Sequence, residues 1–347
     1  MKKSIVLLLA ALSVMACKQE LKTYEISAGY ISLKVTNFGA RVMSLTAPDR
    51  EGNIANIVIG HESPEEYVNP EGERFLGACV GPVANRIGGA RFEVDGVEYN
   101  TPINDNGHNT LHGGFKGVDN LVWDVVSRND TSIVFHLLHP DGLEGYPGNL
   151  DIKMTYLVNS LNEFKITYTA TTDKPTPVNI THHPFFCLRG DGKGSVEEYV
   201  MRIKASHYIP IDAESIPTGK IARVEGTPFD FRENHLIGER IGADDEQLRN
   251  ARGYDHNWCI DKADPYGVEF VCSVYDPKSG RYLEVFSDQP GLQFYSGNFF
   301  TGDEYRASLA LETQRFPDAV NHPDFGEIIL RPGEVYTHTC IYRFSVR

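Results

Sequence analysis

The chain has 347 residues, of which 41% are hydrophobic and 23% are charged, so it can bury a sizeable core and does not have the composition of a disordered polypeptide. Its formal net charge of −14 disfavours binding to nucleic acid or to an anionic membrane surface, because phosphate groups would be repelled. A neutral small molecule is an easier partner for such a chain.

The first residues predict a secretory leader. Two lysines precede a short apolar run, residues 5–12, which is too short to span a bilayer core of about 30 Å as a helix. A small residue then precedes Cys17, as in a bacterial lipobox. We therefore expect a signal peptide over residues 1–16 and a lipid on Cys17, with a short tether over residues 17–24. The protein would be exported and held on the periplasmic or outer face of a membrane by this lipid alone; an ordinary cleaved signal is the alternative.

Hydrophobic residues recur at every second position along most of the remaining chain. This alternation is typical of half-buried strands in antiparallel sheets, and Asp95-Gly96 between two short alternating runs predicts a tight β-hairpin. The clearest alternating segments are residues 31–36, 151–156, 164–168 and 336–346. Because so many strands cannot form one open sheet without curling or splitting, we expect a single all-β domain, residues 25–347, folded as a large antiparallel β-sandwich.

Signals for helices and for cysteine pairs are few. Ser63 before Pro64 predicts a short capped helical turn, and residues 234–250 could hold a short helix. After Cys17 the chain has five further cysteines, an odd number without any Cys-x-x-Cys pair. We therefore expect buried free thiols rather than a disulfide framework or a structural zinc site.

Glu312 is the carboxylate with the most unusual surroundings. In the alternating segment 308–314 it shares one face with Ala310, while leucines occupy the other face. A carboxylate beside small apolar neighbours loses hydration, which raises its pKa and suits a general base. The alternative is a glutamate on the solvent face of an edge strand.

Two adjacent histidines, His182 and His183, stand before Pro184, where a strand is expected to end. On a strand they point to opposite faces, so they cannot chelate one metal ion together, and no supporting ligand spacing is present. One of them could act as a general acid, because imidazole titrates near neutral pH and a nearby carboxylate raises its pKa. The alternative is a histidine that only forms hydrogen bonds at the end of a strand.

Other polar segments are individually weak signals that also fit loops or buried polar groups. Arg86 precedes a tight turn, and His112 precedes two glycines that would let backbone and ligand approach closely. Asp255 stands beside His256, and Gln293 lies among aromatic residues, a mixture suited to sugar hydroxyls and ring faces. No phosphate-binding or dinucleotide-binding glycine motif occurs, and no Gly-x-Ser-x-Gly elbow.

Taken in order, these segments resemble the aldose 1-epimerase (galactose mutarotase) family from about residue 25 to residue 346. The motifs that carry the resemblance are Asn85-Arg86-Ile87, Leu111-His112-Gly113-Gly114, Thr181–Phe186, Gly253–His256, Gln289–Tyr295 and Leu311-Glu312-Thr313-Gln314. The resemblance implies a galactose mutarotase-like β-sandwich with an open site on one sheet. It also implies action on a free monosaccharide without metal or cofactor. Nothing in the sequence demands more than a monomer, so we expect one.

The resemblance further implies roles for individual residues. Glu312 would be the general base and His183 the general acid that together interconvert the α and β anomers of an aldose. We expect Asp255 to lie near this histidine and to favour its charged form. The residues expected to bind the sugar are Asn85, Arg86, His112, Asp255 and Gln293.

The chain departs from the family pattern at three places. His182 and Cys187 each replace a usual asparagine, and residues 81–84 lack an arginine that often precedes Asn85-Arg86. These departures concern the identity of the substrate and the edges of the pocket rather than the acid and base.

Three other functions are alternatives to an aldose 1-epimerase. A glycoside hydrolase needs two carboxylates that flank the scissile bond; only Glu312 and Asp255 suggest themselves, and the histidine would have no role. A non-catalytic carbohydrate-binding protein would keep the fold without needing both an acid and a base. A hexose-6-phosphate epimerase would require extra basic residues at the pocket mouth, which this acidic chain does not indicate.

Overall fold

The computed structural model describes residues 20–347, which consist mainly of antiparallel strands joined by loops and short 3-10 turns. The predicted signal peptide, residues 1–16, and the predicted lipidation residue, Cys17, lie outside the described residues. Within residues 20–347, no helix is long and apolar enough to cross a membrane.

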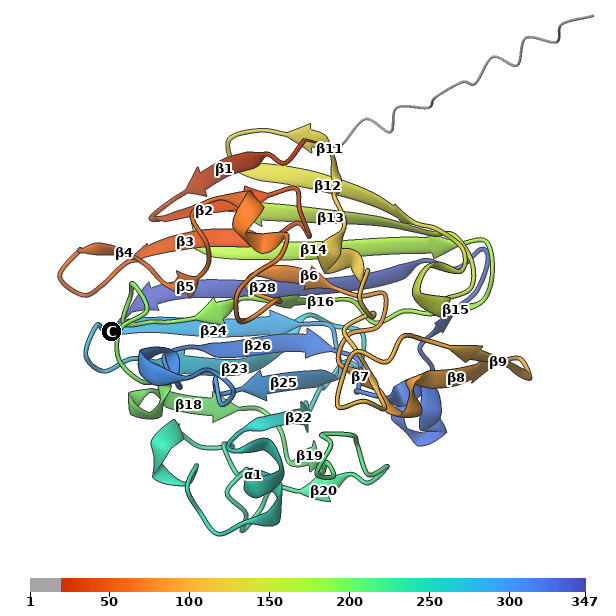
Figure 1. Ribbon diagram of the computed structural model, residues 1–347. Helices are drawn as coiled ribbons and strands as arrows, with labels where there is room; N and C mark the ends of the chain where they lie inside the picture. Colours follow the sequence, from red (N-terminus) through yellow and green to blue (C-terminus); the bar gives the residue numbers. More distant parts are fainter. Residues whose placement is uncertain (1–19) are drawn as a thin grey trace, which may run out of the picture.

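Two large sheets form the body of the protein, and in Figure 1 their strands run across the view in nearly the same direction, as in an aligned sandwich. The nine-stranded sheet contains, in spatial order, β11 (Asp124–Arg128), β12 (Ser132–His139), β13 (Leu150–Val158), β14 (Glu163–Thr172), β28 (Tyr336–Val346), β24 (Arg281–Ser287), β23 (Glu269–Tyr275), β18 (Val200–Ile203) and β21 (His235–Leu236). The seven-stranded sheet contains β20 (Ala222–Arg223), β19 (His207–Ile209), β22 (Asp255–Cys259), β25 (Gly291–Tyr295), β26 (Leu309–Gln314), β17 (Phe185–Phe186) and β5 (Val58–Ile59). The predicted all-β sandwich is therefore confirmed.

Smaller elements complete the described chain. A four-stranded sheet is formed by β1 (Thr23–Ala28), β2 (Ile31–Thr36), β3 (Val42–Pro48) and β4 (Ile54–Asn56). Four strand pairs join β7 (Arg86–Ile87) to β10 (Thr110–Leu111), β8 (Arg91–Val94) to β9 (Val97–Asn100), β6 (Ala78–Val80) to β16 (Thr181–His183), and β15 (Thr176–Pro177) to β27 (Ile329–Leu330). The 3-10 turns are η1 (Pro64–Tyr67), η2 (Gly88–Ala90), η3 (Val118–Asn120), η4 (Leu143–Gly145), η5 (Val196–Glu198), η6 (Ile237–Glu239), η7 (Gly302–Glu304), η8 (Ala319–Asn321) and η9 (Pro323–Phe325).

Two local predictions are confirmed by the backbone. The hairpin between β8 and β9 turns at Asp95 and Gly96, whose φ angles of 53° and 81° are those that a tight hairpin turn requires at both central residues. The capped turn is η1, which begins at Pro64; the N–H of Ser63 donates to Glu66 Oε2 at 2.8 Å.

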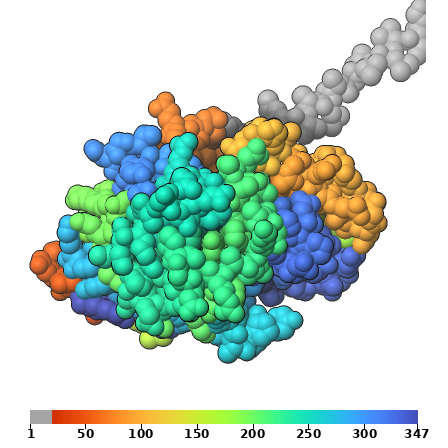
Figure 2. Space-filling view, turned by 90° about the horizontal axis from the view of Figure 1, so that it is seen from below, coloured from red at the N-terminus to blue at the C-terminus, as the bar shows by residue number. Residues whose placement is uncertain are grey.

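The short helix predicted within residues 234–250 is confirmed, and it lies at the C-terminal end of this range. The α-helix of the described chain, α1 (Glu246–Ala251), is a short segment that begins near the end of this range. Asp245 caps it by accepting the N–H of Gln247 at 2.8 Å. It stops because Arg252 adopts a left-handed conformation, with φ of 57°. The segment around α1, coloured green to teal, occupies the middle of the face shown in Figure 2.

The alternation within β26 positions the candidate site. Leu309 and Leu311 point into the core between the two large sheets. There the hydroxyl of Tyr342, on β28, donates to the Leu311 carbonyl oxygen at 3.0 Å and links the sheets. Glu312 therefore points to the opposite, outer side of the seven-stranded sheet. The cysteines of the described chain are free thiols, as predicted; Cys79, Cys187, Cys272 and Cys340 are buried, whereas Cys259 is half-buried.

The chain changes sheets directly beside β26. β16 pairs with β6 and ends at His183, because Pro184 has no N–H to continue the ladder. The next two residues, Phe185 and Phe186, form β17 and pair with β26 and β5. This step brings the end of β16 against the strand that carries Glu312.

Candidate active site

A small cavity of about 110 Å³ opens on the outer side of the seven-stranded sheet. Its lining residues are Glu73, Phe75, Asn85, Arg86, Leu111, His112, His183, Asp255, Tyr295, Phe299 and Glu312. A larger, mainly apolar cavity of about 530 Å³ lies elsewhere, around Ile54 and Val346, but it is lined by neither histidine nor glutamate. The smaller cavity is the one of these two that brings histidine and glutamate side chains together.

Glu312 lies at the bottom of this cavity, with 2% of its surface exposed. β26 pairs with β25 on one side and β17 on the other, so Glu312 is on an interior strand and not on an edge. Burial raises the pKa of Glu312 well above its ordinary value, and the negative charge of Asp255 raises it further, while Arg86 lowers it. Such a carboxyl group exchanges its proton much closer to neutral pH than an exposed glutamate does.

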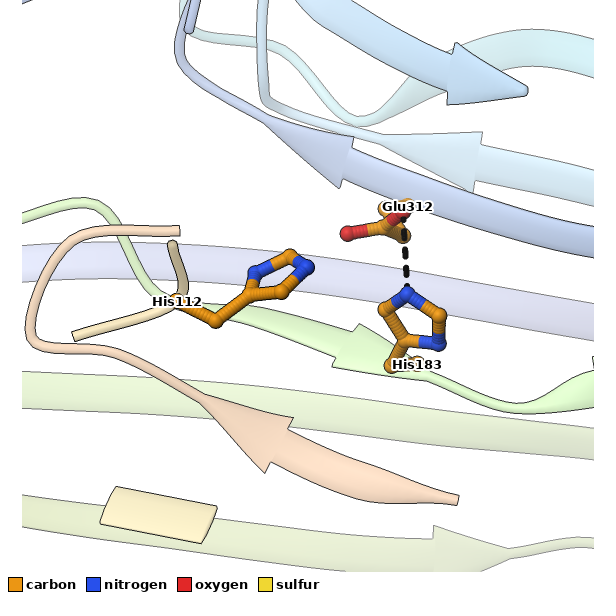
Figure 3. Close-up of side chains that lie close together, drawn as sticks. All are labelled: His112, His183 and Glu312. Carbon is orange, nitrogen blue, oxygen red and sulfur yellow. Dashed lines mark ion pairs between the residues drawn. The ribbon is translucent and has the colours of Figure 1, made fainter. Parts of the chain in front are cut away.

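His183 faces Glu312 across the cavity. Its Nε2 lies 3.4 Å from Glu312 Oε1 (Figure 3). The ring packs against Phe75 and Phe185, with centroid distances of 6.0 and 4.9 Å. Burial among these groups lowers the pKa of His183 to about 4. The structure thus brings together the two residues that the sequence assigned as acid and base.

His182 points to the other face of β16, as predicted for adjacent residues on a strand. Its ring lies in the core between Tyr156 and Phe164, with centroid distances of 5.6 and 5.8 Å. Burial lowers the pKa of His182 to about 3, so this ring is neutral. It packs on the core side of β16 and does not reach the cavity.

His112 is held by the backbone of Asn85. The N–H of Asn85 donates to His112 Nδ1 at 3.0 Å, and burial lowers the pKa of His112 well below its ordinary value. A neutral imidazole whose Nδ1 accepts a hydrogen bond carries its proton on Nε2. His112 therefore supplies a neutral N–H donor. The following Gly113 is required because a Cβ there would lie 2.1 Å from the Gly81 carbonyl oxygen.

Three of these side chains could in principle hold a metal ion. His112, His183 and Glu312 offer ligand atoms that all lie within 4.8 Å of one another. However, Nδ1 of His112 is already bonded to the Asn85 N–H. Binding through Nε2 would require the proton to move to Nδ1, where it would face this N–H donor. The group is better arranged for hydrogen bonding and proton transfer than for chelation.

Arg86 and Asp255 form the other wall of the cavity. Arg86 Nε donates to Asp105 Oδ2 at 3.0 Å, and Arg86 Nη1 lies 4.0 Å from Asp255 Oδ2. Asp255 Oδ1 accepts a hydrogen bond from Gln293 Nε2 at 2.7 Å. Burial raises the pKa of Asp255, whereas Arg86 lowers it. Gln293 lies beside Glu312 in the sheet register but does not line the cavity. It therefore positions Asp255 and does not make the direct contact with the sugar that the sequence predicted.

The expectation that Asp255 keeps the histidine charged is wrong. The charge of Asp255 acts on Glu312. For His183, burial is the largest effect, and it favours the neutral ring, as does the positive charge of Arg41. Burial outweighs the predicted attraction because the imidazolium would lose most of its hydration inside the cavity.

Comparison with known proteins gives the same family that the motifs indicated. The aldose 1-epimerase family model matches residues 22–343. The chain belongs to the aldose 1-epimerase family. It is 39% identical to the galactose mutarotase of Rattus norvegicus and 37% identical to the aldose 1-epimerase of Escherichia coli strain K12, in each case over 334 residues that cover 93% of this chain and 94% of the relative.

Solved structures of aldose 1-epimerases support the assignment. An aldose epimerase homologue from C. elegans superposes with a TM-score of 0.86 at 29% identity, covering 94% of this chain and 99% of that one. A galactose 1-epimerase from Lactobacillus acidophilus superposes with a TM-score of 0.79, also at 29% identity, and covers 93% of each chain.

Several residues of this aldose 1-epimerase site escaped the sequence reasoning. Phe75 packs against His112 with a centroid distance of 4.5 Å, and Glu73 accepts the N–H of Phe75 at 2.8 Å. Both come from a loop without hydrophobic alternation, which carries no local signal. Conversely, His256, singled out for its neighbour Asp255, packs against Phe229 at 4.6 Å, outside the cavity.

Proposed function

We propose that this protein is an aldose 1-epimerase that interconverts the α and β anomers of a free aldose by general acid–base catalysis. The observation that carries the proposal is the pair Glu312 and His183, whose reactive atoms face each other at 3.4 Å in one cavity. Glu312 removes the proton from the anomeric O1–H, and His183 donates a proton to the ring oxygen O5. The C1–O5 bond breaks and C1–O1 becomes a carbonyl. The carbonyl then turns about C1–C2, and the same steps run in reverse.

The pair Glu312 and His183 holds the one proton that this mechanism requires, although burial favours its placement on Glu312. Burial favours protonated Glu312 and neutral His183, whereas the proposed direction starts from ionised Glu312 and protonated His183. Both arrangements contain the same number of protons, so one proton transfer between the two residues interconverts them. The pair therefore begins and ends a cycle with one proton to give and one site to receive it.

The surrounding groups suit the charge changes of ring opening. The Nε2–H of His112 and the guanidinium of Arg86 are donors that could stabilise negative charge on a sugar oxygen. Asp255, fixed by Gln293, is an acceptor for a sugar hydroxyl. We propose that these residues bind and orient the sugar, and that Asn85 acts through its backbone by fixing His112.

The test of this function is polarimetry of freshly dissolved α-galactose, α-glucose and α-xylose with the purified protein in a buffer containing EDTA. We expect at least one sugar to reach its equilibrium rotation faster than in buffer alone, because the chemistry uses side chains rather than a metal ion. Uncatalysed traces for all three sugars would refute the assignment. Sugar binding without faster exchange would then indicate a binding protein, and reducing sugar released from a nitrophenyl glycoside would indicate a hydrolase.

We also propose, from the first residues of the sequence, that the protein is exported and anchored to a membrane through a lipid on Cys17. Labelling of cells with palmitate should mark the wild-type protein and not the Cys17→Ser variant; equal labelling of both would refute the anchor. Because all the groups of the proposed mechanism come from one chain, a monomer would suffice, with residues 25–347 acting as one domain.

A further inference from the structure

Three buried amide side chains lie beside the floor of the cavity, on the outer face of the seven-stranded sheet. In the register of β22, β25 and β26, Asn257 lies opposite Gln293, which in turn lies opposite Glu312. Gln314 is two residues beyond Glu312 on β26, so its side chain points to the same face. Asn257, Gln293 and Gln314 are only 2%, 3% and 0% exposed. These three amides, which we call the amide row, continue the polar floor of the site into the interior.

A glycine lets the amides approach one another. Gly291, on β25, lies opposite Gln314. A Cβ at Gly291 would lie 2.6 Å from Asn257 Oδ1 and 3.1 Å from Asn257 Nδ2. The amide of Asn257 therefore extends over Gly291, in the direction of β26, and occupies the place where another residue would carry its side chain. Asn257 is thus next to Gln293 on one side and reaches toward Gln314 on the other.

Most polar atoms of the amide row have no hydrogen-bond partner among residues 20–347. They are Asn257 Nδ2 and Oδ1, Gln293 Oε1, and Gln314 Nε2 and Oε1. The exception is Gln293 Nε2, which donates to Asp255 Oδ1 at 2.7 Å. Buried amides without partners destabilise a fold, and in proteins such groups are commonly joined by ordered water. Because apolar side chains of the same size would not carry this cost, the amide row indicates a role other than packing.

The bond to Asp255 gives the amide row a direction. Each amide has a donor end and an acceptor end, whereas an ionised carboxylate only accepts. Because Asp255 takes the donor end of Gln293, Gln293 Oε1 faces away from Asp255 and requires a donor of its own. Asn257 Nδ2, on the paired strand, is suited to this role, and Gln314 can supply a donor to Asn257 Oδ1 in the same way. Without these donors the Gln293 amide could turn, and its oxygen would then repel Asp255.

We propose that Asn257 and Gln314 are positioning residues that fix, through bridging water, the amide orientation of Gln293 and thereby the carboxylate of Asp255. This inference rests on the proposed function, in which Asp255 accepts a hydrogen bond from a sugar hydroxyl. The amide row then holds the sugar in register with the acid and the base without touching it.

Polarimetry at a series of pH values tests the amide row with Asn257→Leu and Gln314→Met, which replace an amide by an apolar side chain of similar size. The substrate is whichever of α-galactose, α-glucose and α-xylose the wild-type protein interconverts fastest. Each variant should lower kcat/KM by about tenfold, within the roughly 10²-fold that a misplacement of 1 Å can cost. The acid limb of the pH profile should move to higher pH, because burial raises the pKa of Asp255 and the bond from Gln293 opposes this rise. The unfolding temperature should not fall, because an unpaired buried amide is removed.

A double-mutant cycle with Gln293→Met separates positioning from a purely structural role. If Asn257 acts through Gln293, Asn257→Leu should cause no further loss once Gln293 is replaced. The matched control is Cys259→Ala, on the same strand and face as Asn257 but without an amide, which should keep the wild-type rate and pH profile. Wild-type rates and pH profiles in both row variants, or a full additional loss in the Gln293→Met background, would overturn the amide row and leave the proposed function standing. A wild-type protein that accelerates none of the three sugars would overturn both.

Discussion

Glu312→Gln should lower kcat/KM for anomer interconversion by about 10²–10⁴-fold, the contribution typical of a positioned general base. The glutamine side chain has nearly the same volume, so the cavity keeps its shape. It cannot accept the O1 proton, and the partner His183, 3.4 Å away, is left without a base to complete the transfer. Polarimetry or NMR of anomer exchange measures the loss directly.

Thermal unfolding separates this loss from a folding defect. Because burial raises the folded-state pKa of Glu312 well above 4.5, the unfolded chain releases this proton at lower pH than the folded chain does. The contribution of Glu312 to stability therefore falls as pH rises from 4.5 through the folded-state pKa. Glu312→Gln removes this decline, so the variant should unfold at the same or a higher temperature than wild type at neutral and mildly alkaline pH.

A surface glutamate supplies the control for the Glu312 variant. Glu93→Gln, at an exposed position of β8, should keep wild-type activity. Activity of Glu312→Gln within about tenfold of wild type would show that the base has been assigned to the wrong residue.

The sequence could predict where Glu312 points but not what surrounds it. The alternation of leucines in β26 fixes the face on which Glu312 lies, because side chains alternate along a strand. Whether that strand is an edge or an interior strand depends on its pairing with β25, which precedes it across an irregular loop, and with β17, which is distant in the chain. The solvent-exposed alternative could be rejected only once these neighbours were known.

The protonation states of the site residues were harder to predict from the sequence than the identity of those residues. Motifs identified His112 and His183 by position alone. The tautomer of His112 depends on a backbone N–H from Asn85, 27 residues away in the chain, and the lowered pKa of His183 depends on packing by Phe75 and Phe185. Both effects come from three-dimensional burial, for which the local sequence carries no signal.

Removal of the acid should produce a loss similar to that of the base. His183→Gln is expected to lower kcat/KM by about 10²–10⁴-fold, because no group at this position can then protonate O5. The two single variants should differ in the pH dependence of their residual rates. In His183→Gln, which keeps Glu312, the rate should rise with pH as the carboxyl group ionises. In Glu312→Gln, which keeps His183, the rate should fall as pH rises through the pKa of the ring, which burial lowers to about 4 in the wild type.

The double variant tests whether the two residues work as one unit. In the wild type, the rate should fall at low pH, where both groups are protonated, and at high pH, where both have lost their protons, with apparent pKa values that belong to the pair. Since either single loss already breaks the proton exchange, Glu312→Gln combined with His183→Gln should be scarcely slower than either variant alone. If the losses in the double variant multiply fully, or if the two single variants have parallel pH profiles, the residues act independently. The proposal that Glu312 and His183 share a proton would then be wrong.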